Sequence, residues 1–82
     1  MKIIYFANVK EIIGKDSETL KIDKPIKISE VVKILTNKTK KHHTAFTKIS
    51  NINCSLNHNF SDFDQIVLDD DELAFFPPVT GG

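Results

Sequence analysis

The chain has 82 residues, 40% of them hydrophobic and 27% charged, which suits one small folded domain rather than a disordered segment. Eleven lysines balance eleven acidic residues and there is no arginine, so the basic surface of a nucleic-acid-binding protein is excluded. One cysteine excludes an internal disulfide, and no apolar run is long enough to span a bilayer, so we expect a cytoplasmic protein without a membrane partner.

The N-terminal part predicts two strands joined by a short helix. Residues 1–7 (MKIIYFA) are rich in β-branched and aromatic side chains, which is typical of a buried strand. Asn8 can cap a short helix, VKEII, which Gly14 ends in the C′ position. Residues 18–23 (ETLKID) alternate in hydrophobicity and predict a second strand, antiparallel to the first.

One central helix is expected in the middle of the chain. Ser29 is a suitable N-cap, and apolar residues at Val31 and at three and four positions beyond it form one face of a helix from about Glu30 to Lys40. Residues 41–48 (KHHTAFTK) lack this pattern, and we expect them to form an irregular connection.

The second half of the chain predicts more strands. Residues 49–56 alternate in hydrophobicity, the run Asn57-His58-Asn59 favours a turn, and Phe60 begins a short returning strand. The acidic run at residues 69–71 predicts a further, solvated turn.

The last strand is expected at residues 72–76 (ELAFF), where Pro77 and Pro78 end it because proline cannot donate a ladder hydrogen bond. Together these elements predict an α+β domain with a β-grasp, or ubiquitin-like, fold: a mixed sheet of about four to five strands with one main helix on one face. We assign this domain to residues 1–78 and a flexible C-terminal Gly-Gly tail to residues 79–82.

A single helix covers only one face of a sheet, so apolar residues on the other face require an explanation. Phe75 and Phe76 point to opposite faces of the last strand, and Ile4 and Phe6 share one face of the first. An apolar, uncovered face indicates a protein partner. Loops that fold over the sheet are the alternative, and the pattern does not choose between them.

Two of the three glycines in the chain are its last two residues, Gly81 and Gly82. A carboxylate becomes an electrophile when it is converted to a mixed anhydride with AMP, and a terminal glycine leaves that carbonyl unhindered. Pro77 and Pro78 are stiff and extended, so they direct the tail away from the body. A frayed terminus is the alternative, but the succession of strand, prolines and glycines favours a carboxylate presented to another protein.

The stretch DDDELAFFPPVTGG resembles the C-terminus of the molybdopterin synthase small subunit family, the sulfur carriers of molybdenum-cofactor synthesis. The resemblance extends over nearly the whole chain. YFANVKEIIG is similar to the first strand and short helix of the family, SEVVKIL to its central helix, and LNHNF to its asparagine-containing turn. PPVTGG after a hydrophobic strand is the most specific of these motifs, because a bare Gly-Gly is shared by ubiquitin-like proteins generally.

The resemblance implies that an ATP-dependent adenylyltransferase activates Gly82 and that a sulfur donor converts it to a thiocarboxylate. The sulfur is then passed to cyclic pyranopterin monophosphate, forming the molybdopterin dithiolene. By the same resemblance the tail inserts into the large subunit of molybdopterin synthase, which supplies the catalytic side chains in a heterotetramer. The inserting residues are Pro77, Pro78, Val79, Thr80 and Gly81. Phe75 and Phe76 are the expected contacts with the large subunit, and ATP is used by the activating enzyme, with no cofactor or metal on this chain.

Two positions depart from the family pattern. Asp70 stands where the family usually has glycine before the last strand, which has a cost if that position needs a positive φ. Lys10 stands where the family often has arginine, which would weaken any bidentate contact made there.

Other residues that could carry chemistry are better explained by structure. Cys54 belongs to an alternating segment and is expected to be a small buried residue rather than the sulfur carrier. His42, His43 and His58 lack the spacing of metal ligands and are expected in loops.

Two further functions remain open from the sequence. One is a sulfur carrier for another pathway, such as thiazole formation for thiamine. The other is a ubiquitin-like modifier that joins Gly82 to lysines of other proteins, which predicts ladders of conjugates on a gel.

Overall fold

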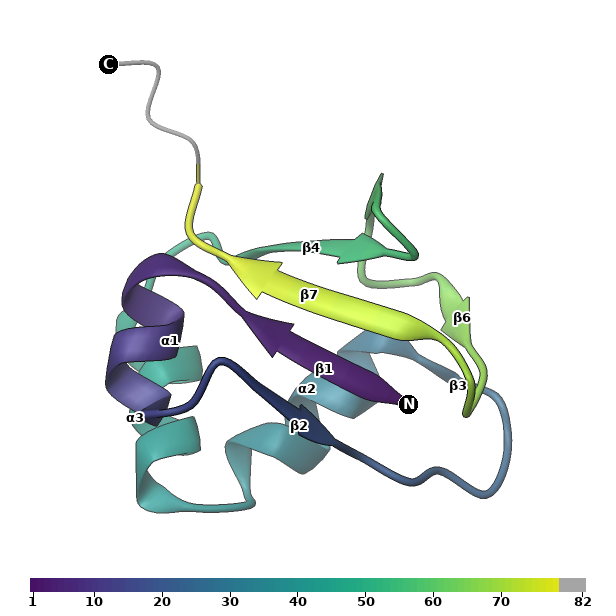
Figure 1. Cartoon of the computed structure of the whole chain (residues 1–82), viewed down its shortest axis with the longest axis horizontal. Helices are drawn as coiled ribbons and strands as arrows, with labels where there is room; N and C mark the ends of the chain where they lie inside the picture. The colour runs from purple at the N-terminus through teal and green to yellow at the C-terminus, as the bar shows by residue number, and fades with distance from the viewer. Residues whose placement is uncertain (79–82) are drawn as a thin grey trace.

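The computed structural model describes residues 1–78, whose centre is a five-stranded mixed sheet (Figure 1). The strand order is β2-β1-β7-β4-β5, with β1 and β7 parallel and the other neighbours antiparallel. The strands are β1 (Lys2–Tyr5), β2 (Ser17–Thr19), β4 (Asn53–Leu56), β5 (Asn59–Ser61) and β7 (Glu72–Phe76). The predicted α+β class and strand number are therefore confirmed, and the last strand has the predicted bounds.

Within residues 1–78 three helices accompany the sheet, one more than the predicted short helix and central helix, and Figure 1 shows α2 passing behind β1. They are α1 (Ala7–Ile13), α2 (Ile28–Thr36) and α3 (Lys40–Lys48). The prediction of an irregular connection at residues 41–48 is wrong, because α3 occupies it. The Thr39 side chain caps this helix, and Ala45 is its one buried apolar residue, so its sequence has few apolar residues from which to recognise it.

The helix α2 begins earlier and ends earlier than predicted, at Ile28 and Thr36. Ser29 is not its N-cap, because the first backbone N–H groups of the helix already have partners in a neighbouring loop. Ile28 N–H donates to the carbonyl of Gln65 and Ser29 N–H to the carbonyl of Phe63, each at 2.9 Å. Backbone carbonyls from a distant segment thus accept the first N–H groups of α2, which a capping side chain would accept in an isolated helix.

The helix α1 follows the prediction at its end and departs from it at its start. Gly14 has φ 87°, and its N–H donates to the carbonyl of Lys10, which is the predicted left-handed C-cap. The N-cap is Phe6 rather than Asn8, and Ala7 turns the chain with φ 52°. The strand β1 is anchored there because Phe6 N–H donates to the carbonyl of Phe75 at 3.1 Å.

A second, two-stranded sheet pairs β3 (Ile26–Lys27) with β6 (Ile66–Val67). Two residues are too few to show an alternating pattern, so neither strand is predictable from hydrophobicity. The strand β2 is also shorter than the predicted residues 18–23, since the chain leaves the sheet after Thr19.

The turns before β5 and β7 depend on asparagine and aspartate side chains. Asn57 and His58 have φ values of 49° and 73°, as a two-residue type I′ hairpin requires. The carboxylates of Asp69 and Asp71 accept backbone N–H groups at 2.9 and 2.7 Å. Within the described residues Asp70 is not among those with a positive φ, so the expected cost of replacing glycine there does not arise.

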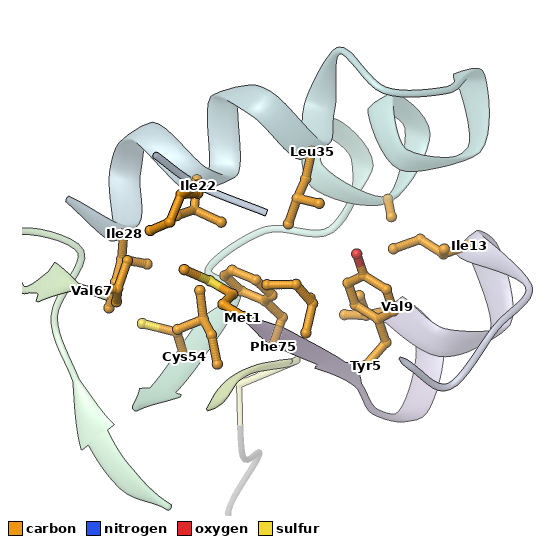
Figure 2. Packing of buried hydrophobic residues seen from close by; sticks show 14 residues of the cluster. Met1, Tyr5, Val9, Ile13, Ile22, Ile28, Leu35, Cys54, Val67 and Phe75 are labelled. Atoms are coloured by element: carbon orange, nitrogen blue, oxygen red, sulfur yellow. The ribbon is translucent and has the colours of Figure 1, made fainter. Parts of the chain in front are cut away.

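The core lies between the inner face of the sheet and the helices (Figure 2). Its fully buried members alternate along the strands, as the sequence pattern predicts. They include Ile3, Tyr5, Leu73 and Phe75 from the sheet, Val31 and Leu35 from α2, and Cys54 from β4. In the described range 1–78, no helix is long and apolar enough to cross a membrane.

Candidate functional site

The C-terminal strand β7 lies in the middle of the sheet, between β1 and β4. It is hydrogen-bonded on both sides, so its direction is fixed by two neighbours as far as Phe76. Pro77 is half-buried and Pro78 is exposed, which places the exit of the chain at the surface. The remaining predicted tail residues, at positions 79–82, lie outside the described residues.

The two phenylalanines that end β7 have different environments. Phe75 is fully buried, stacked on Tyr5 with ring centroids 6.4 Å apart and edge-on to Phe46 at 5.2 Å. The prediction that Phe75 contacts a partner is therefore wrong, because its side chain is part of the core. Phe76 is half-buried on the opposite face, where a partner can reach it.

The opposite face of the sheet carries an apolar patch that we call the uncovered face, made of Ile4, Phe6, Phe60, Ala74 and Phe76. The register places three of them side by side, because Ile4 pairs with Ala74, and Ala74 and Phe60 both pair with Ser55 of β4. Phe6 is 50% exposed and Phe60 is 79% exposed. The rings of Phe60 and Phe76 meet edge-on at 5.6 Å.

Charged residues of both signs border the uncovered face. A hollow of ≈ 320 Å³ on the β1 side is lined in part by Lys2, Lys10 and Asp16. Glu72 of β7, the cross-strand neighbour of Lys2, has a carboxylate oxygen 2.9 Å from Nε2 of His58. A partner that covers this face therefore meets an apolar centre with a charged rim of mixed sign.

Sequence reasoning missed Phe60 as a member of the site. It was expected only to begin a returning strand, and the signal available was its place just after the predicted turn. Phe60 lies in an edge strand, is 79% exposed and packs on Phe76, so it contributes little to the packing of the core. Its exposure is consistent with a role in contact with another molecule.

The other candidate side chains have structural roles. Cys54 is buried as predicted, and burial, followed by the negative charge of Asp62, raises the pKa of its thiol to about 11. Such a thiol is a poor nucleophile at neutral pH. The expectation of loop positions is wrong for His42, which is buried in α3, and for His43 in the same helix, whereas His58 lies in the predicted turn.

The parallel central pair, the antiparallel neighbours and the helices on one face define a ubiquitin-like β-grasp protein whose last strand ends at the surface. The chain belongs to the ThiS family, whose model matches residues 3–82.

Three comparisons with known proteins agree with this assignment. The chain is 30% identical over 82 residues to the "Molybdopterin synthase sulfur carrier subunit" of Escherichia coli (strain K12), covering 100% of the chain and 99% of that protein. It is 34% identical over 83 residues to the protein of the same name from Haemophilus influenzae, with coverage of 100% and 99%. The crystal structure of SAMP1 from Haloferax volcanii shares the fold with a TM-score of 0.81 at 23% identity, covering 100% of the chain and 98% of that structure.

Proposed function

We propose that this chain is a sulfur carrier subunit of molybdopterin synthase and that its reactive group is the main-chain carboxylate of Gly82. The observation that carries the proposal is the placement of β7, a central strand that ends at Pro77 and Pro78 beside the uncovered face. The full-length relatives named as molybdopterin synthase sulfur carrier subunits support it.

The proposed reaction uses the chain as a covalent co-substrate. An adenylyltransferase joins the Gly82 carboxylate to AMP from ATP and releases pyrophosphate. A sulfur nucleophile then displaces AMP and leaves a thiocarboxylate. In the synthase the thiocarboxylate sulfur attacks a carbon of cyclic pyranopterin monophosphate and replaces an oxygen substituent, whose carbon–oxygen bond breaks. Water then cleaves the acyl–sulfur bond, which leaves the sulfur on the pterin and restores the carboxylate. Two such transfers complete one dithiolene.

The uncovered face is the proposed contact with the large subunit of the synthase. Phe6, Phe60 and Phe76 are aromatic, partly or largely exposed, and next to the strand that leads to the tail. Aromatic side chains near the centre of an interface supply a large share of binding energy. The folded domain can bind the large subunit through the uncovered face while the tail enters the active site of that subunit. Pro77 and Pro78 separate the tail from the domain, so one contact does not prevent the other.

Intact-mass measurement tests the carrier role directly. After incubation with ATP, an activating enzyme and a sulfur source, we expect the mass of the protein to rise by the difference between sulfur and oxygen. A variant lacking Gly82 is expected to show no such rise. Cys54→Ala is the matched control and is expected to keep it, because the buried thiol has no part in the transfer.

Two results would contradict the proposal. One is a Gly82 deletion that still supports sulfuration of the pyranopterin. The other is a gain of a whole sulfur atom that disappears in Cys54→Ala, which would indicate a persulfide on the thiol. Conjugate ladders on a gel in place of a free thiocarboxylate would favour a protein modifier instead.

A further inference from the structure

A buried polar cluster joins β1, β2 and α3. Glu18 in β2 has only 7% of its side chain exposed. One of its carboxylate oxygens accepts hydrogen bonds from the Tyr5 hydroxyl at 2.6 Å and from Nε2 of His42 at 2.5 Å. The other oxygen accepts from the Lys38 ammonium group and lies 3.7 Å from Nζ of Lys15. We call this set of five side chains the Glu18 cluster.

Thr39 connects the Glu18 cluster to the first turn of α3. Its Oγ1 accepts the backbone N–H of His42 at 3.1 Å, which makes Thr39 the N-cap, and it also lies 2.7 Å from Nδ1 of the same ring. A carboxylate only accepts hydrogen bonds, so Nε2 of His42 must carry a proton where it faces Glu18. The ring of His42 therefore links the cap of α3 to the strand β2.

The helix α3 is weak by itself. It has nine residues, KKHHTAFTK, whereas isolated helices shorter than ~12–15 residues are marginal in water. Its first turn carries Lys40 and Lys41 and no acidic residue, although the helix dipole favours negative charge there. Glu18 provides a negative charge near this end from a neighbouring strand, in addition to the packing of α3 against α1 and α2.

At neutral pH the charge of Glu18 is complemented by the hydrogen-bond donors around it. Burial raises the pKa of Glu18, but hydrogen bonds from His42, Lys38 and Tyr5 outweigh burial and lower the pKa to about 2. Burial, together with the hydrogen bond to Glu18, raises the pKa of the Tyr5 hydroxyl, which keeps this group a donor. The carboxylate is thus ionised and faces donors from three elements of the fold.

We propose that the Glu18 cluster is a conformational lock that ties the N-terminal turn of α3, which packs against α1 and α2, to the edge strand β2, so that its loss lets α3 detach while the sheet stays folded. The helix also contributes Phe46, whose ring packs edge-on against Phe75 at 5.2 Å. Detachment of α3 would therefore uncover part of the core on the side of the sheet opposite to the uncovered face.

Hydrogen exchange of the intact chain at neutral pH tests the lock. In Glu18→Gln, which keeps the size of the side chain and removes its charge, we expect the amides of residues 40–48 to exchange faster by about tenfold or more. The amides of β1 and β7 are expected to stay much better protected than those of α3, because they exchange only when the whole domain unfolds. His43→Gln is the matched control, because His43 lies next to His42 in α3 but is exposed, and we expect no change there.

Unchanged protection of α3 in Glu18→Gln would overturn the proposal, as would equal protection of α3 and the sheet, which would indicate that α3 opens only by global unfolding. If Glu18→Gln fails to fold, Tyr5→Phe removes one donor and is expected to give the same selective pattern with a smaller factor. Nitrogen NMR of His42 provides an independent check: a protonated Nε2 supports the lock, and a ring protonated at Nδ1 alone contradicts it.

Discussion

Replacing Phe75 and Phe76 one at a time separates the core from the proposed interface. Phe75 is fully buried between Tyr5 and Phe46, and truncation of a buried phenylalanine to alanine typically costs about 3–5 kcal/mol. A chain of 82 residues is expected to have roughly 4–12 kcal/mol of total stability, so Phe75→Ala removes a large part of it. Phe76→Ala loses mainly an edge-on contact with Phe60, worth about 1 kcal/mol.

The assay has two arms, urea unfolding of each variant and calorimetric binding to the large subunit of molybdopterin synthase. We expect Phe75→Ala to lower the free energy of unfolding strongly and Phe76→Ala to lower it slightly. We expect Phe76→Ala to weaken binding by about tenfold or more, as loss of an aromatic anchor at an interface does. Equal destabilisation by the two variants would refute the assignment of the faces, and unchanged binding of Phe76→Ala would refute the uncovered face as the contact.

Three more predictions concern groups within the domain. The pKa of Glu18 is about 2 instead of 4.5, so the ionised carboxylate contributes about 3 kcal/mol to the free energy of unfolding. This contribution is complete above about pH 5 and is lost as the pH falls toward 2. Urea unfolding of the wild type and of Glu18→Gln across this pH range measures it. Gly14→Ala should cost about 1 kcal/mol in a thermal unfolding experiment, because φ is 87° while an added Cβ would have its nearest neighbour at an ordinary 3.5 Å. Cys54 should resist a disulfide reagent at neutral pH until urea unfolds the chain; rapid reaction of the native protein would contradict its burial.

The features that sequence reasoning predicted correctly depend on local chemistry. The strand β7 combines alternation with a proline stop, and Gly14 can adopt a positive φ at the end of α1 at little cost. Asn57 suits the left-handed conformation of a hairpin turn. In each case the physical cause lies within a few residues of the effect, so it is visible in the chain.

The features that were missed depend on contacts between distant segments. Glu18 and His42 are 24 residues apart in sequence, and nothing near either residue indicates the other. The helix α3 has one buried apolar residue and packs against α1 and α2, which come from earlier in the chain, so its own sequence gives little sign of it. Alternation separates Phe75 from Phe76, but only the pairing with β1 determines which of them is in the core.

The candidate site was predictable in part. The prolines and the apolar character of the outward face follow from the order of residues in the last strand. Phe60 was missed because its membership depends on the pairing of β5 with β4, which places it beside Phe76. A site whose members come from β1, β5 and β7 needs a register before those members can be recognised.

The parallel pairing of Lys2 with Glu72 has a consequence for synthesis of the chain. The strand β1 is synthesised long before its central neighbour β7, and until β7 has emerged β1 and β4 have no strand between them. Closure of the domain is therefore a late, long-range event. A copy without β7 cannot form the uncovered face, because β7 joins the parts of the sheet that carry its members.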